Sequence, residues 1–326
     1  MERIEKVDYL SAAGLGKTCQ KMQGVKPASR DRIRIGLLII DPQNTFCHPE
    51  LAELLVPHAW EDNTRLMHFI LDNIARITAI DVSLDTHSPM QIFHPIFWVD
   101  KDGNHPAPGT EITHENVVRG MWRINPEVGY RFSRTQKWLD DYALWYTSEL
   151  EKREKKPLMI WTYHGILGSF GHALDSSVEY AIFVHEMARQ TTRFTILKGT
   201  NPFTEYYSIV GPEVSKAHDG SVIDNFNFEL IRRFLGYDTL IIAGQSRSHC
   251  APESLNDIMN NAESADEFAP RSKLRIGNIY FLDDCSSSIP GFEKQTNEAF
   301  ARFAARGLHI VKSTTPMEEW PNIELN

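Results

Sequence analysis

The sequence predicts an α/β fold: a three-layer α/β/α sandwich with a mainly parallel, Rossmann-like central sheet. Two observations lead to this prediction. Short apolar runs rich in β-branched residues alternate with amphipathic segments of helix length, which is the pattern of repeated βαβ units. Charged, imidazole and thiol side chains follow several of these runs, at the strand ends where parallel sheets collect their functional groups.

Each expected element is read from hydrophobic periodicity. Strands are expected near 33–40, 77–84, 158–161, 193–197, 239–243 and 278–282, with a last one from 308 to 312. Helices are expected over 59–74, 176–190, 225–235, 252–260 and 294–305. This order predicts right-handed crossovers between parallel strands.

The chain of 326 residues is expected to form one domain, residues 31–326, behind an N-terminal arm, residues 1–30. A long insertion at about 95–156 interrupts the alternation of strands and helices. Insertions of this length beside a strand end are often lids or oligomer contacts. The basic run at 151–156 is interleaved with glutamates and is expected to be a solvated helix end.

Composition excludes several classes of protein. The formal net charge of −9 and the absence of a basic stripe argue against nucleic-acid binding. Four cysteines lie far apart, which indicates neither a disulfide framework nor a thiolate zinc site. No apolar signal core opens the chain, and no run is long enough to span a membrane. A cytoplasmic protein with reduced thiols is therefore expected.

Cys250 is the candidate nucleophile. It follows an apolar strand, Gly244 and a short polar turn, and it opens a helical stretch. Unpaired N–H groups and the helix dipole at such a position lower the pKa of a thiol and favour the thiolate. The alternative is a buried structural cysteine, the commoner fate of a lone thiol.

Two further strand ends supply a carboxylate and an ammonium group. Asp41 follows an apolar strand, so its partly desolvated carboxylate could accept the thiol proton; otherwise it caps the next turn. Lys198 ends another strand and could pair with Asp41 and stabilise the thiolate; otherwise it is a surface lysine.

Four residues form a candidate metal site. Asp85 and His87 follow a strand as Asp-x-His, which places both side chains on one face. His94 and His164 add two imidazoles, and this donor set suits a divalent metal, zinc first, with iron or manganese as alternatives. Each histidine alone is more often a hydrogen-bonded polar residue than a ligand.

These segments resemble a known family. Asp41 in Asp-Pro-Gln-Asn-Thr-Phe, Lys198 in Lys-Gly, and Cys250 after the strand–Gly turn are similar to the Asp–Lys–Cys triad of isochorismatase-like cysteine hydrolases. The metal-containing nicotinamidases are the most similar members. Their metal pattern is matched by the Asp85, His87, His94 and His164 set. The resemblance spans roughly residues 33–312 and leaves the arm and the insertion outside.

The resemblance implies that Asp41 takes the proton of Cys250, which attacks a carboxamide and forms a thioester. It also implies a cis peptide between Gln245 and Ser246, an oxyanion site at the N–H groups of Ser246 and Cys250, and a metal that binds a pyridine nitrogen. Phe46, Trp161 and Tyr207 would line the substrate pocket. Members are usually oligomeric, so a homodimer or homotetramer is expected, and the apolar patches expected at 96–99 and 121–122 of an exposed insertion agree with this.

The turn before the nucleophile departs from the family pattern Gly-x-Ala-Thr-Asp-x-Cys-Val. Ser248 replaces the acid, and Arg247 is expected to add a cation beside the site. Three hypotheses follow, in this order: a metal-containing cysteine amidohydrolase acting on a small aromatic carboxamide such as nicotinamide; a metal-independent relative cleaving a carbamoyl, ureido or vinyl ether group; and a non-catalytic scaffold that binds a partner through the insertion.

Overall fold

A six-stranded parallel sheet forms the centre of the computed structural model, which describes residues 4–153, 155–265, 269 and 272–325. The strand order is β10-β9-β8-β1-β2-β7, and every neighbouring pair is parallel. The strands are β1 (Ile35–Ile40), β2 (Ala79–Asp85), β7 (Phe194–Lys198), β8 (Thr239–Gly244), β9 (Ile279–Leu282) and β10 (His309–Val311).

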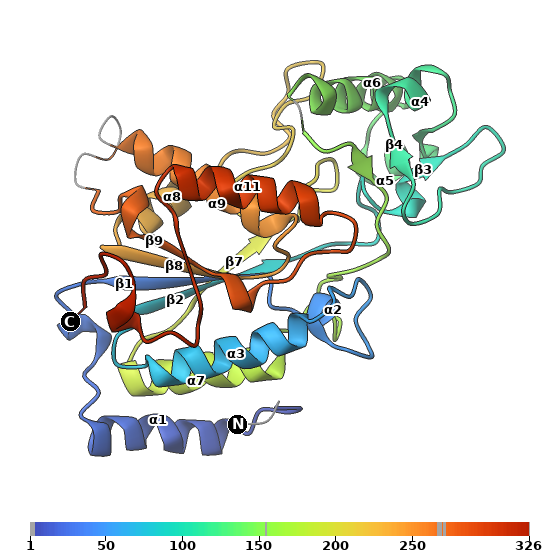
Figure 1. Ribbon diagram of the computed structural model, residues 1–326. Helices are drawn as coiled ribbons and strands as arrows, with labels where there is room; N and C mark the ends of the chain where they lie inside the picture. The colour runs from blue at the N-terminus through green and yellow to red at the C-terminus, as the bar shows by residue number, and fades with distance from the viewer. Residues whose placement is uncertain (1–3, 154, 266–268, 270–271, 326) are drawn as a thin grey trace.

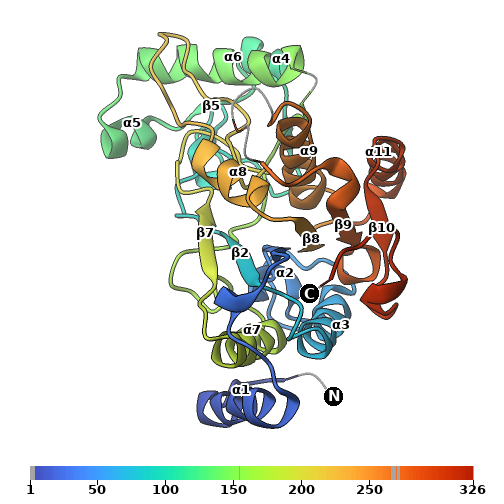
Figure 2. The same ribbon diagram turned by 90° about the vertical axis from the view of Figure 1, so that its left-hand side faces the viewer.

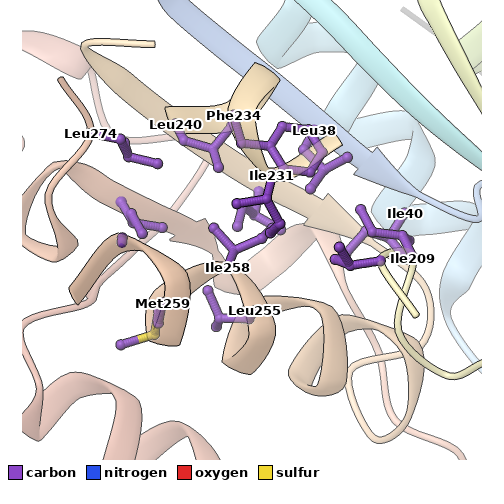
Figure 3. Packing of buried hydrophobic residues seen from close by; sticks show 14 of the residues in the cluster. Leu38, Ile40, Ile209, Ile231, Phe234, Leu240, Leu255, Ile258, Met259 and Leu274 are labelled. Carbon is purple, nitrogen blue, oxygen red and sulfur yellow. The ribbon is translucent and has the colours of Figure 1, made fainter. Parts of the chain in front are cut away.

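Helices cover both faces of this sheet because its central strands are apolar on both sides. In β1, Leu38 and Ile40 pack toward one layer, and Leu37 and Ile39 toward the other. The first layer holds α8 (Phe228–Leu235), α9 (Cys250–Glu263) and α11 (Glu293–Ala305), and the second holds α3 (Ala59–Asp72) and α7 (Ser176–Arg189) (Figures 1 and 2). Figure 3 shows α9 side chains such as Leu255 packed against the first face. The predicted three-layer sandwich is confirmed.

The N-terminal residues add a helix outside the second layer. Helix α1 (Tyr9–Gln23) packs on α7 through Ala12, Gly16 and Cys19. A Cβ at Gly16 would lie 2.6 Å from the Cβ of Met187, so the close approach of the two helices requires glycine there. A 3-10 turn, η1 (Ala28–Arg30), then leads to β1.

The insertion forms a small unit at one end of the sheet (Figure 1). Two antiparallel strand pairs belong to it: β3 (Trp98–Val99) pairs with β5 (Arg123–Ile124), and β4 (Glu111–Ile112) pairs with β6 (Leu158–Met159), which directly follows the insertion. Its helices are α4 (His114–Val118), α5 (Pro126–Phe132) and α6 (Gln136–Lys152).

Two expectations about this region were wrong. The apolar run at 96–99 is not an exposed patch, because Phe97 and Trp98 are fully buried in the insertion's own core with residues of α6. The strand expected at 158–161 does not join the central sheet, because Leu158 pairs antiparallel with Ile112. Periodicity identifies an apolar run but does not name its pairing partner, so this strand was assigned to the wrong sheet.

Short elements complete the chain: α2 (Asn44–Cys47), η2 (Pro95–Phe97), η3 (Ile276–Asn278), η4 (Asp283–Cys285) and η5 (Met317–Glu319). Within the described parts of the chain, every helix is too short or too polar to cross a membrane.

Candidate active site

Four adjacent strands end at one edge of the sheet and bring the predicted reactive residues together. The order β8-β1-β2-β7 places the ends of β8 and β1 side by side, with Gly244 in register with Ile40. On the other side of β1, Asp85 of β2 is in register with Lys198 of β7. Asp41 follows β1 directly, and Cys250 opens α9 after the β8 turn.

Lys198 links these strand ends through its ammonium group. Its Nζ lies 3.1 Å from Oδ2 of Asp41, 2.9 Å from Oδ1 of Asp85 and 3.6 Å from Sγ of Cys250. It also donates a hydrogen bond to the carbonyl oxygen of Tyr206 at 3.0 Å. Burial alone would lower the pKa of Lys198, but the two carboxylates outweigh burial and hold it well above its usual value.

The pKa of the Cys250 thiol is raised well above its usual value, so the lowered pKa expected from the helix start is wrong for this structure. Burial is the main cause, and the Asp41 and Asp85 carboxylates add to it against the opposing effect of Lys198. Burial also raises the pKa of Asp41, although Lys198 limits the rise. Both shifts favour a protonated Cys250 thiol and make the Asp41 carboxylate more basic. Asp41 must therefore contact Cys250 to take its proton.

Asp41 is held in place by Ser83, a residue that sequence reasoning missed. The backbone of Asp41 has a φ of 45°, in the left-handed region that non-glycine residues seldom occupy. Its N–H donates to Oγ of Ser83 at 3.0 Å, and that hydroxyl donates to Oδ1 of Asp41 at 2.6 Å. With Oδ1 bound in this way, Oδ2 is left for Lys198.

The turn between β8 and α9 exposes two backbone donors. The peptide bond between Gln245 and Ser246 is cis. The N–H groups of His249 and Ala251 donate to the Ser246 carbonyl at 3.2 and 3.1 Å. Within the described chain, the N–H groups of Ser246 and Cys250 make no hydrogen bond to protein, so both can receive a ligand oxygen.

Glycine is required at the start of this turn. Gly244 has a φ of 112°, and a Cβ there would lie 2.1 Å from the Ile40 carbonyl oxygen. The next residue, Gln245, donates its N–H to the same oxygen at 2.6 Å. The side chain of Gln245 does not line the pocket and instead donates to Oδ2 of Asp62 at 3.0 Å. Gln245 therefore anchors the turn from behind.

Arg247 does not face the site, contrary to expectation. Its guanidinium pairs with Asp283 at 2.6 Å and lies 4.2 Å from the ring centroid of Phe300 in α11. Ser248 accepts a hydrogen bond from the N–H of Ile289 at 3.0 Å, which ties the turn to the following loop. Ser248, which stands where the family has an acid, thus contacts a loop.

Three of the four predicted metal ligands converge. The ligand atoms of Asp85, His87 and His164 lie within 4.8 Å of one another, and all three side chains are buried. Nε2 of His87 is 2.9 Å from Oδ1 of Asp85, and Nε2 of His164 is 3.6 Å from Oδ2. His94 falls outside this group, although its ring centroid is 5.5 Å from that of His164.

The donor chemistry fits a divalent cation. Nδ1 of His87, His94 and His164 lies 3.0, 3.1 and 2.8 Å from the carbonyl oxygens of Gly199, Pro89 and Thr162. A carbonyl only accepts, so in each neutral imidazole Nδ1 is the protonated nitrogen and Nε2 is the one available to a cation. Nε2 of His94 is buried without a hydrogen-bond partner among the described residues, and Nε2 of His87 is buried 2.9 Å from the Asp85 carboxylate. Burial and the two neighbouring histidines lower the pKa of His94 to about 3.

A pocket opens onto Cys250. The three predicted aromatic residues, Phe46, Trp161 and Tyr207, all line it. Its other walls come from Leu54, Val56, Asp85, His164, Glu205, Tyr206, Ser246, His249 and Ile289. Apolar and aromatic side chains with a few polar groups among them, including Glu205 and His249, are typical of a site for a small organic molecule.

Glu205 is the main residue of the pocket that the sequence did not indicate. Burial, followed by the Asp85 charge, raises the pKa of this carboxyl from 4.5 to about 7. It follows Lys198 by seven residues in an irregular segment, with no periodic signal to single it out. Gln43 was also missed: its amide contacts both the N–H and the carbonyl of Asp85, at 2.6 and 2.9 Å. Its place two residues after Asp41 in a polar turn was the one available signal.

No family model matches the sequence, and no curated protein does. Solved structures do match. The yeast nicotinamidase Pnc1p bound to the inhibitor nicotinaldehyde has a TM-score of 0.53 and 16% identity, over 85% of this chain and 99% of that one. A nicotinamidase/pyrazinamidase from Acinetobacter baumanii has a TM-score of 0.52 and 15% identity, over 87% and 99%. The chain therefore has the fold of the nicotinamidases, as the resemblance in its sequence implied.

Proposed function

We propose that this chain is a cysteine amidohydrolase that cleaves a small aromatic or heteroaromatic carboxamide, such as nicotinamide, to the carboxylic acid and ammonia. One observation carries the proposal: a single buried ammonium group, that of Lys198, contacts both Asp41 and Cys250 at the base of an apolar pocket. Burying charged groups costs free energy, and perturbed buried charges cluster at functional sites. This favours catalysis over a structural role.

The chemistry follows from the order of these groups. Asp41 accepts the proton of Cys250 while the sulfur attacks the amide carbon, and the carbonyl oxygen gains negative charge beside the N–H groups of Ser246 and Cys250. Protonated Asp41 then donates to the leaving nitrogen, the C–N bond breaks, and ammonia departs. Asp41 next takes a proton from water, whose oxygen displaces the sulfur, so the acid and the free thiol are released.

Asp85, His87 and His164 would hold a divalent metal, zinc first, with iron and manganese as alternatives. A metal there would supply a Lewis acid for a ring nitrogen of the substrate. Lys198 contacts Asp85 as well as Asp41, so the same ammonium group fixes the spacing between the metal ligands and the nucleophile. His94 lies beside the three candidate ligands and would be a fourth ligand.

Nicotinamide is proposed from the pocket and from the relatives. The lining residues Phe46, Trp161 and Tyr207 present rings to a planar substrate, and the solved structures of the same fold include nicotinamidases.

The test is ammonia release from a panel of carboxamides by zinc-loaded protein, with Cys250→Ala and Cys285→Ala compared. Cys285 is also a buried free thiol but does not line the pocket, so its variant controls for the loss of a cysteine. We expect Cys250→Ala to lose at least about 10⁴-fold in kcat, since no nucleophile remains. Retained turnover in that variant would refute the proposal.

Metal analysis separates the two enzymatic hypotheses. Stoichiometric metal and loss of activity on chelation support the proposed reaction. Full activity in metal-free protein, with turnover of ureido or carbamoyl compounds in place of carboxamides, would favour the metal-independent alternative.

A further inference from the structure

The insertion ends in two adjacent lysines that make different contacts. Nζ of Lys156 donates to the carbonyl oxygen of Ser248 at 3.2 Å and to Oε1 of Glu253 at 3.3 Å. It also lies 5.1 Å from the centroid of the Tyr207 ring. Residues 151–153 form the solvated helix end that was expected of the basic run 151–156, but the Lys156 side chain is only 28% exposed and points toward the nucleophile turn.

The partners of Lys156 lie on both sides of Cys250. Ser248 precedes the nucleophile by two residues, and Glu253 belongs to the first turn of α9, which Cys250 opens. The peptide group that carries the Ser248 carbonyl has its N–H, that of His249, bonded to the Ser246 carbonyl at 3.2 Å. With both ends of this group held, the peptide plane immediately before the N–H of Cys250 has a fixed orientation.

The same ammonium group faces one wall of the pocket. The ring of His249 lies 5.4 Å from the Tyr207 ring, 5.6 Å from the Trp161 ring and 4.6 Å from the Phe292 ring, measured between centroids. Lys156 sits over Tyr207, so a cation–π contact braces the aromatic residue against which His249 packs. The ammonium group of Lys156, which lies outside the central sheet, therefore contacts both the nucleophile turn and the aromatic wall of the pocket.

Lys155 provides an internal comparison. Its Nζ lies 3.1 Å from Oε2 of Glu213 and 3.7 Å from Oε2 of Glu253. It thus shares Glu253 with Lys156 and joins the same two parts of the protein. Among the described contacts, however, Lys155 reaches neither the Ser248 carbonyl nor the Tyr207 ring.

We propose that Lys156 is a positioning residue, through which the insertion holds the nucleophile turn and the aromatic wall in their reactive geometry. The inference rests on the proposed function, because the turn it positions is the one that carries Cys250 and the oxyanion donors. It gives the insertion a role in the chemistry although, of residues 95–153, 155 and 156, which the structure describes, none lines the pocket.

The test compares Lys156→Met, Lys155→Met and Lys156→Arg in the full-length, zinc-loaded protein. Methionine keeps an unbranched apolar chain and removes the charge. We measure kcat and KM for the best carboxamide, the thermal midpoint, and the rate of Cys250 alkylation by iodoacetamide, read by peptide mass spectrometry. The last measurement needs no substrate turnover.

For Lys156→Met we expect kcat to fall at least tenfold with KM changed less than threefold, and alkylation of Cys250 to slow at least threefold. Lys155→Met should keep kcat and the alkylation rate within twofold of wild type. Its thermal midpoint should fall by about as much as that of Lys156→Met. Lys156→Arg should recover part of kcat, since a guanidinium can still donate to the Ser248 carbonyl. A purely structural role would move the midpoint alike in both methionine variants and leave the alkylation rate unchanged.

Equal kcat and equal alkylation rates in the two methionine variants would overturn the inference and leave the proposed function intact. If wild type hydrolyses no carboxamide yet the alkylation rates differ as expected, the proposed substrate class is wrong and the positioning role stands. If Cys250 of the wild type is not alkylated at all, both are refuted.

Discussion

Removing the charge of Lys198 is the sharpest test of the buried charge cluster. In metal-free protein the cluster holds the carboxylates of Asp41 and Asp85 and one compensating ammonium group, whose Nζ is 3.1 and 2.9 Å from them. Lys198→Met leaves two buried carboxylates without a cation. Breaking a buried pair in this way typically costs about 3–5 kcal/mol, because an uncompensated charge remains in a medium of low dielectric constant.

At about 2 °C for each kcal/mol in a chain of this size, the thermal midpoint should fall by roughly 6–10 °C. The assay is thermal unfolding followed by circular dichroism at pH 7 in the presence of a chelator. The deficit should shrink as the pH falls, because a carboxyl whose folded pKa is raised destabilises the fold only where it is ionised.

A double variant decides whether charge is the cause. Lys198→Met with Asp41→Asn restores the net charge of the cluster to its original value, and the amide can still accept from Ser83, as Oδ1 of Asp41 does. We expect the double variant to be about 1–3 kcal/mol more stable than Lys198→Met alone. A single variant that loses under about 1 kcal/mol, or a double variant less stable than the single, would refute the reasoning.

Three further predictions concern the pocket, the turn and the metal ligands. Because burial raises the pKa of Glu205 to about 7, its ionisation destabilises the fold as pH rises from 4.5 through 7. The free energy of unfolding of metal-free Glu205→Gln should therefore exceed that of wild type by up to ~3 kcal/mol at pH 8 and by little at pH 4. A stability difference independent of pH would contradict this. Gly244→Ala should lose at least about 3 kcal/mol or fail to fold, since its Cβ would meet the Ile40 carbonyl at 2.1 Å, whereas Gly14→Ala in α1 has open space and should be neutral or stabilising in the same unfolding assay. Zinc should raise the thermal midpoint of wild type by binding the folded state, and His164→Ala should reduce that increase at least by half; an undiminished increase would place the metal elsewhere.

The sequence was informative about everything set by local pattern. Six of the seven expected strands are strands of the central sheet. A buried parallel strand needs a short, continuous apolar run, and such a run can be seen directly in the order of the residues. The residues that follow them, Asp41, Asp85, Lys198 and Cys250, could be picked out because the carboxyl ends of parallel strands lie at one edge.

Long-range packing accounts for what was missed. The strand at 158–161 pairs inside the insertion, so His164 reaches Asp85 from a loop and not from a central strand. Arg247 turns away from the pocket because Asp283 and Phe300 receive it, and neither partner is near it in sequence. Lys156 makes its contact with the Ser248 carbonyl across 92 residues of sequence, and the Asp85 charge that helps to raise the pKa of Glu205 also comes from a distant segment.

By itself, the sequence determined the layer architecture, the strand ends that carry reactive groups, and the chemical types available there, since these depend on periodicity and residue identity. The tertiary structure decided which groups touch and how their pKa values shift: the pKa of the Cys250 thiol is raised, chiefly by burial, with the Asp41 and Asp85 carboxylates acting in the same direction. Desolvation depends on everything that surrounds a group, and that environment is assembled from distant segments of the chain.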